Sequence, residues 1–218
     1  MGAIHFSVDP ELVGALRRVL PLRVFFETGT FRGDTAAAVA PEFEKVHTVE
    51  VSVPVHARAA ARLSAYRNVS VILGNSPAVL RELGGQLASA SVLYWLDAHW
   101  CGGETGGAQQ ECPLLAELDA IGTLNSQSAV LIDDARLFLA PPPEPHAIDQ
   151  WPLLEEVVGH LRRLSRTHKL WIINDVFVFV PPAAFEAVIR YGRARGVDLA
   201  QLARAAGRGA GVPRPPGP

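Results

Sequence analysis

The chain has 218 residues, of which 49% are apolar and 19% are charged, and its formal net charge is −2. This composition is typical of a globular domain with a sizeable core, and the charge gives no electrostatic reason to expect a nucleic-acid or membrane partner. No apolar run approaches the roughly 20 residues of a membrane span, and the first residues lack the features of a signal peptide. With only two cysteines as well, we expect a soluble cytoplasmic protein.

Helices and strands alternate along most of the chain. Asp9 and Pro10 are typical of a helix start, and Pro21 ends that helix. In chain order, the predicted elements are a helix at 10–20, a strand at 23–28, a helix at 34–40, a strand at 45–51, a helix at 55–66, a strand at 69–73, a helix at 77–83, a strand at 91–96, a helix at 113–121, a strand at 129–132 and a helix at 151–164. Because the strands read as continuous apolar runs, they predict a parallel sheet with helices on both faces.

The last two strands are expected to differ from the others. The segment KLWIINDVFVFV, Lys169–Val180, holds two apolar runs separated by Asn174 and Asp175. Both residues tolerate the positive φ of a tight hairpin turn, so these strands should be antiparallel. The predicted fold is therefore α/β: a Rossmann-like three-layer sandwich with a mostly parallel seven-stranded sheet and a C-terminal antiparallel hairpin.

The sequence indicates a single domain. Residues 1–206 show no internal repeat, and the first helix lies within residues 1–22. Eight of the twelve residues in 207–218 are Gly or Pro, so we expect a disordered tail there.

The first predicted strand ends in ETGTFRGDT, residues 27–35. Gly29 and Gly33 permit positive φ and close backbone approach, and the helix that follows offers unpaired N–H groups. The segment does not spell GxGxxG and lacks the lysine of a phosphate-binding loop. A tight strand-to-helix turn without a ligand is the alternative.

Small polar or acidic residues also end the next two strands. Glu50, in HTVEVS, follows Glu27 by 23 positions, and an acid at this place can accept both ribose hydroxyls of an adenosine. The third strand ends in GNS, Gly74–Ser76. These residues either contact an adenine ring or form an ordinary turn and helix cap.

Aspartates follow the fourth and fifth strands. Asp97 and His99 lie in LDAHW, and Asp133 and Asp134 lie in LIDDAR. Two adjacent carboxylates repel each other, and after an apolar strand they need a cation or strong donors. Three acids at neighbouring strand ends predict a site for Mg²⁺. Helix capping, or pairing with Arg136, is the alternative.

These segments, in this order, resemble class I S-adenosylmethionine-dependent methyltransferases, and most nearly the macrocin and novobiocin-type sugar O-methyltransferases. ETGTFRGDT resembles motif I, VEVS the acidic motif of strand two, GNS the adenine turn, and the hairpin the reversed seventh strand of that family. The resemblance covers about residues 23–181. It implies cofactor contacts from Glu27, Thr28, Gly29, Thr30, Gly33, Thr35, Glu50, Val51, Asn75, Ser76 and Asp97.

The same resemblance implies the catalytic residues. In that family a D-x-D after strand four and a DD after strand five hold Mg²⁺ and supply a base, which implies Asp97, Asp133 and Asp134 as metal ligands. His99 replaces the second acid of D-x-D. With a reference pKa near 6.5, a histidine can serve as a general base, so His99 and Asp97 are the expected catalytic residues. A metal-ligating or a structural His99 is the alternative.

The segment WCGGETGGAQQECP, Trp100–Pro113, is long enough to form a lid over the predicted site. Cys101 and Cys112 either approach each other across it or stay reduced, and their spacing matches no zinc motif. Glu104 and Glu111 could face a substrate.

The sequence thus predicts a methyltransferase that uses S-adenosylmethionine to methylate a hydroxyl of a small molecule, such as a natural product or a sugar, with the help of Mg²⁺. Two alternatives are an enzyme of the same fold with other chemistry, on this cofactor or on a nicotinamide, and a non-catalytic binding module. The N-terminal segment carries no acceptor domain. The acceptor pocket must then come from loops or from a second subunit, as in a homodimer.

Overall fold

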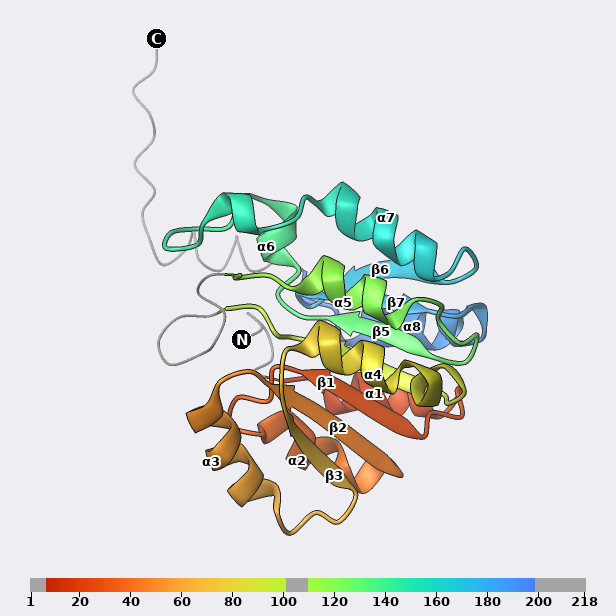
Figure 1. Ribbon diagram of the computed structural model, residues 1–218. Coiled ribbons are helices and arrows are strands. Elements are labelled where there is room, and N and C mark those ends of the chain that lie inside the picture. Colours follow the sequence, from red (N-terminus) through yellow and green to blue (C-terminus); the bar gives the residue numbers. More distant parts are fainter. Residues whose placement is uncertain (1–6, 101–109, 199–218) are drawn as a thin grey trace, which may run out of the picture.

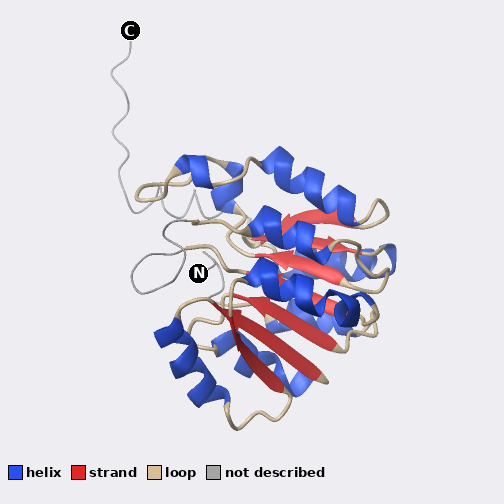
Figure 2. Cartoon of the chain, in the orientation of Figure 1, coloured by secondary structure: helices blue, strands red, loops and turns tan. Residues whose placement is uncertain are grey.

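The computed structural model describes residues 7–100 and 110–198. They form a seven-stranded sheet between two layers of helices (Figures 1 and 2), with the strand order β3-β2-β1-β4-β5-β7-β6. The strands are β1 (Val24–Thr28), β2 (Lys45–Glu50), β3 (Val69–Leu73), β4 (Val92–Leu96), β5 (Ala129–Ile132), β6 (Lys169–Ile173) and β7 (Val176–Val180). Strands β1 to β5 pair in parallel, whereas β7 is antiparallel to both β5 and β6. The predicted fold is therefore confirmed.

The hairpin turn has the expected backbone. Asn174 and Asp175 have φ values of 52° and 69°, and the register pairs Ile173 with Val176 across them. Asn and Asp are the residues that adopt this left-handed conformation most readily. Because β7 is reversed, β6 ends at the same edge of the sheet as β1 to β5.

Helices cover both faces of the sheet. They are α1 (Pro10–Arg17), α2 (Asp34–Val39), α3 (Val53–Leu63), α4 (Ser76–Ala88), α5 (Leu114–Ile121), α6 (Arg136–Leu139), α7 (Leu154–Leu164) and α8 (Pro182–Arg195), with short 3₁₀ turns at Ala40–Glu42 and Ile148–Gln150. In Figure 1, α4, α5 and α7 lie in front of the sheet, and α1 and α8 lie behind it. Within the described ranges, no helix is both long and apolar enough to span a bilayer.

The two faces of the sheet have separate cores because neighbouring strand residues point to opposite sides. Phe25 and Trp95 are fully buried on the face of α1, α2 and α8. Phe26 and Tyr94 pack on the face of α4, α5 and α7. The central strands are thus buried on both sides, which explains their continuous apolar sequences.

Several helix boundaries differ from the prediction, among them those of α3, which spans Val53–Leu63 rather than 55–66. The helix predicted to end at residue 83 runs through two glycines to Ala88, because Leu87 packs into the core. The helix predicted from residue 151 begins at Leu154, where the Glu156 carboxylate accepts the Leu153 N–H at 2.8 Å. The first helix ends at Arg17 rather than at residue 20. The short α6 and the fourteen-residue α8 were not predicted.

The turn after β1 brings two strands that are distant in sequence into backbone contact. The N–H of Asp97 donates to the carbonyl of Thr28 at 3.2 Å, and the N–H of Gly29 donates to Val49 at 2.9 Å. Gly29 has a φ of 84°, and a Cβ built on it would lie 2.2 Å from the carbonyl oxygen of Asp97. A glycine is therefore required here by backbone conformation and by space.

We expect Gly29→Ala to destabilise the protein by about 2–4 kcal/mol, because it adds a positive-φ penalty to a backbone clash. Urea denaturation measures this change in the free energy of unfolding. The matched control is Gly84→Ala in α4, where a Cβ meets nothing within 4 Å. This control should stabilise the helix by about 0.5–1 kcal/mol. Equal stability of the Gly29→Ala protein and the wild type would contradict the role of Gly29.

Candidate functional site

The candidate site lies at the carboxyl edge of the sheet, where the strand order reverses between β1 and β4. The register pairs Thr28 with Val49 on one side and with Leu96 on the other, and Leu96 pairs with Ile132. The residues that follow β2, β1, β4 and β5 therefore lie next to one another. In open α/β sheets, this switch point is the usual place for a ligand.

Glu27 belongs to a buried hydrogen-bond chain at the end of β1. Its side chain accepts the Thr48 hydroxyl at 2.5 Å, and Thr48 lies 2.6 Å from the Thr30 hydroxyl. Burial raises the pKa of Glu27 to about 8, although hydrogen bonds from Thr48 and Thr35 favour the charged form. In the described structure Glu27 is 1% exposed, so it lies beneath the glycine turn rather than on its surface.

Glu50 is held by the backbone on two sides. One carboxylate oxygen accepts the Phe31 N–H at 3.0 Å, and the other accepts the Ser52 N–H at 2.9 Å. Phe31 has a φ of 46°, so the turn is bent into the left-handed region where its N–H meets Glu50. The carboxylate is fixed in orientation, and each oxygen keeps a further lone pair for a ligand.

The other predicted cofactor residues form two groups. Val51 is 50% exposed and Asn75 is also exposed, so both can contact a ligand. Thr28 and Ser76 are buried; the Thr28 hydroxyl accepts the Asp97 N–H at 3.1 Å.

Two further predicted cofactor residues lie at the start of α2. The hydroxyl of Thr35 forms a hydrogen bond with that of Ser7 at 2.7 Å. Gly33, at a φ of 76°, forms the N-cap of α2.

Glu117 is a buried acid that the sequence interpretation missed. It lies on α5 and is 1% exposed, and its carboxylate accepts the Ser76 hydroxyl. Burial raises its pKa to about 7, against the hydrogen bonds from Ser76 and Thr28. Glu117 thus links the ends of β1 and β3 under the site. The sequence did contain a sign of this burial, because Glu117 lies on the apolar face of the helix between Leu114 and Leu118.

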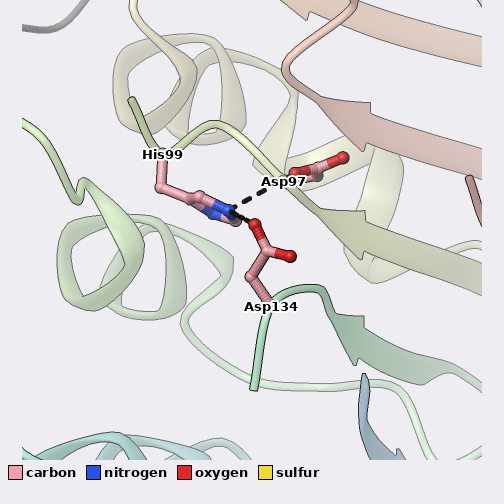
Figure 3. A group of neighbouring side chains, drawn as sticks. All are labelled: Asp97, His99 and Asp134. Atoms are coloured by element: carbon pink, nitrogen blue, oxygen red, sulfur yellow. Dashed lines mark hydrogen bonds and ion pairs between the residues drawn. The ribbon is translucent and has the colours of Figure 1, made fainter. Parts of the chain in front are cut away.

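Asp97, His99 and Asp134 come together at the ends of β4 and β5 (Figure 3). The Nε2 atom of His99 lies 2.6 Å from Asp134 Oδ2 and 3.7 Å from Asp97 Oδ1. One ligand atom from each of the three residues lies within 4.8 Å of the others, which is close enough to share a metal ion. The His99 ring is fixed from the other side by Trp151, with ring centroids 5.6 Å apart.

Asp133 is not part of this group, so the geometry differs from the predicted ligand set Asp97, Asp133 and Asp134. Asp133 is 1% exposed, and its Oδ2 atom has no hydrogen-bond partner among the described residues. Burial and the neighbouring charge of Asp134 raise its pKa to about 7. Burial and the charge of Asp133 likewise raise the pKa of Asp97. The group that the structure brings together thus contains His99 in place of Asp133, which is the metal-ligating alternative for His99 that the sequence left open.

The backbone conformation of Asp134 helps to explain the difference. Asp134 has a φ of 53°, and Arg136 donates to its Oδ1 at 2.5 Å while His99 holds Oδ2. Burial disfavours the charged carboxyl, but hydrogen bonds from His99 and Arg136 outweigh it and hold the pKa of Asp134 below its usual range. Arg136 also forms an ion pair with Asp175 in the hairpin turn.

Glu111 does not face an open pocket, contrary to one expectation from the sequence. Its carboxylate is 4% exposed and accepts the Trp151 indole N–H at 2.8 Å and the Ala147 N–H at 3.1 Å. His146 lies 3.1 Å away. Burial opposes the charge of Glu111, yet these hydrogen bonds lower its pKa. Glu111 therefore fixes Trp151, the residue that packs on His99.

The remaining parts of the predicted lid lie outside the described residues, including Cys101 and Glu104. Among the described residues Cys112 is a free thiol, and burial raises its pKa to about 12. Such a thiol is protonated at neutral pH and is a poor nucleophile and metal ligand. The predicted tail at 207–218 also lies outside the described residues.

The strand order and the position of the site define a Rossmann-like α/β fold with a reversed last strand, and solved structures share it. The chain is similar to a candidate caffeoyl-CoA O-methyltransferase from Staphylococcus aureus, with a TM-score of 0.53, 16% identity and coverage of 79% of this chain and 84% of that one. It is also similar to a candidate methyltransferase from Streptococcus mutans in complex with SAH, with a TM-score of 0.50, 13% identity and coverage of 76% and 92%. No family model and no curated protein matches the sequence. At these identities the likeness is one of fold.

The raised pKa of Glu27 predicts a pH-dependent stability. Below the unfolded pKa of 4.5, Glu27 is protonated in both the folded and the unfolded protein. Its contribution to the free energy of unfolding is therefore fully present at that pH. As pH rises, the unfolded chain ionises first, while the folded protein keeps the proton until about pH 8. The contribution is lost over this interval, and we estimate the loss in the free energy of unfolding to be on the order of 5 kcal/mol.

Urea denaturation of wild type and Glu27→Gln between pH 5 and pH 9 measures this contribution. Relative to the variant, the wild type should lose free energy of unfolding as pH rises. The matched control is Glu82→Gln, since Glu82 is exposed on α4 and the difference should then stay constant. A constant difference for Glu27→Gln as well would show that Glu27 is ionised in the folded protein at neutral pH.

Proposed function

We propose that this protein is an S-adenosylmethionine-dependent methyltransferase that methylates a hydroxyl group of a small molecule. The observation that carries the proposal is the arrangement at the switch point. An anchored acid, Glu50, and the glycine turn lie on one side of it, and the Asp97–His99–Asp134 group lies on the other. The chain shares its fold with a structure solved in complex with SAH, which supports the proposed cofactor.

The residues beside the glycine turn suit this cofactor. Gly29 has no side chain at the point where β1 and β4 meet, so only backbone lines that part of the edge. Glu50 is oriented by two N–H groups and can accept the ribose hydroxyls. Exposed Val51 and Asn75 lie at the ends of β2 and β3, where an adenine would bind. When bound, S-adenosylmethionine supplies a methyl group already activated by a sulfonium.

The Asp97–His99–Asp134 group offers both oxygen and nitrogen atoms, so it suits a divalent cation that binds both kinds of ligand. Two carboxylates suit Mg²⁺, but an imidazole nitrogen suits Mn²⁺ and later transition metals better. We therefore assign the cation to Asp97, His99 and Asp134 and expect Mn²⁺ to bind more tightly than Mg²⁺. The Asp133 carboxyl, whose Oδ2 has no hydrogen-bond partner among the described residues, lies close enough to this group to raise the pKa of Asp97.

The state of His99 Nε2 decides how the acceptor hydroxyl is handled. A nitrogen that held a cation could not also take a proton. Asp97 would offer one carboxylate oxygen to that cation and keep the other, so it would be the residue that accepts the hydroxyl proton. With no cation at this nitrogen, Nε2 carries a proton and donates to the Asp134 carboxylate at 2.6 Å, so Nδ1 is the atom of His99 that can take the hydroxyl proton, and Asp134 stabilises the imidazolium that results. In both cases the protein contributes orientation and charge placement.

We expect saturable binding of S-adenosylhomocysteine in a calorimetric titration, and at least a tenfold loss of affinity in Glu50→Gln. This change removes one acceptor oxygen and the charge that strengthens hydrogen bonds from the ribose. The control is Glu44→Gln, because Glu44 is exposed at the opposite end of β2. Absence of binding at millimolar ligand, or equal affinity of the Glu50 variant and wild type, would contradict the proposed cofactor site.

Mn²⁺ binding tests the metal group and can be followed by electron paramagnetic resonance. His99→Ala and Asp134→Asn should each weaken binding by tenfold or more, since each removes one of three protein ligands. Asp133→Asn should weaken binding less, because Asp133 is outside the group. If Asp133→Asn has the largest effect and His99→Ala has none, the ligand set predicted from the sequence is the correct one.

A further inference from the structure

A cavity separate from the candidate site lies between the β6–β7 turn, α6 and the C-terminal half of α8, and Arg136 forms part of its lining. Its volume is about 600 Å³, within the range of small-molecule sites. None of the residues that line it belongs to the candidate cofactor or metal residues. What it binds is therefore a separate question from the proposed methyl transfer.

The cavity gathers apolar side chains that are unusually exposed. Leu139, Trp171 and Ile172 are 53%, 45% and 38% exposed, and all three line it. Trp171 stacks on Phe185 of α8 with an interplanar angle of 19°, which fixes its indole. Exposed apolar surface that is gathered in one concave place marks a binding site more often than scattered exposure does.

A glycine keeps the cavity open. Gly192 lines the wall formed by α8, and a Cβ built on it would lie 3.0 Å from Ile173 Cδ1. A larger side chain at this helical position would project from α8 toward β6. A substitution of Gly192 by a larger residue would therefore fill the cavity without changing a charged group.

The polar part of the lining is mainly cationic. Arg136 and Arg193 both line the cavity, with Asp175 as the acidic residue among the lining groups. Asp175 is already paired with Arg136. Arg193 is exposed, and in the described part of the chain its charge is not matched by an ion pair.

We infer that this cavity binds a flat, mainly apolar organic acid, with its ring against Trp171 and its carboxylate at Arg193. The indole and the aliphatic walls match an aromatic ring system, and an arginine pairs with a carboxylate through two parallel hydrogen bonds. The inference concerns binding alone and holds whether or not the protein transfers methyl groups.

Calorimetric titration of the full chain with 2-naphthoate tests the inference. We expect saturable binding, weakened about tenfold in Arg193→Gln and at least tenfold for the neutral amide 2-naphthamide. Arg190→Gln is the matched control, because Arg190 is exposed on the same helix but does not line the cavity. This control should bind 2-naphthoate like the wild type. Gly192→Leu, which fills the space, should abolish binding.

Three results would overturn the inference. One is the absence of saturable binding by the full chain, which includes the case in which a second copy of the chain occupies the cavity. Another is equal loss of affinity in Arg193→Gln and Arg190→Gln, since binding would then reflect overall charge. The third is displacement of 2-naphthoate by S-adenosylhomocysteine, which would place the probe in the cofactor site. Circular dichroism checks that each variant is folded. If Gly192→Leu does not fold, Arg193→Gln still tests the inference, because Arg193 is exposed and its substitution should not disturb the fold.

Discussion

The close contact between the backbones after β1 and β4 is the constraint on which the rest of the site depends. Gly29 and Asp97 approach so closely that no side chain fits between them, and the Asp97 N–H is shared by the carbonyl and hydroxyl of Thr28. This contact fixes where β4 stops. It therefore also sets where Asp97 and His99 stand relative to the glycine turn, so one backbone junction positions both halves of the candidate site.

Buried acids surround this junction at a considerable energetic cost. Glu27, Glu117 and Asp133 are each 1% exposed, and burial raises the pKa of all three. Hydroxyl groups offset part of this cost for the two glutamates, but Asp133 keeps an unpartnered oxygen in the described structure. Such destabilising groups persist in proteins mainly where function requires them, and here they lie beneath or beside the same strand ends.

The sequence was sufficient to predict the sheet, because its signals are local. Apolar runs, helix starts and the Asn174-Asp175 turn each depend on residues close in the chain. Predictions of the strand ends placed the candidate residues correctly along one edge. The missed helix α8 follows Pro181 and has a mixed composition, with buried Ala184, Val188 and Tyr191 spread along fourteen residues. Its apolar face is defined by the sheet against which it packs.

The partners within the site could not be read from the sequence, because they depend on side-chain direction. His99 and Asp134 are 35 positions apart, and which of the two adjacent aspartates meets the histidine depends on the left-handed turn at Asp134. Similarly, Glu117 meets Ser76 across 41 positions. A pattern of acids at strand ends predicts that a charged site exists, but not which carboxylate completes it.

The hairpin that closes the sheet is also connected to the candidate site. Asp175, in the β6–β7 turn, accepts the Arg136 N–H at 2.7 Å and pairs with its guanidinium, which in turn holds Asp134. Asp134 holds His99. The reversed strand thus has a role beyond completing the sheet, because its turn supports the residue that orients the histidine. Since Arg136 also lines the cavity beside α8, the same guanidinium is the physical connection between that cavity and the candidate site.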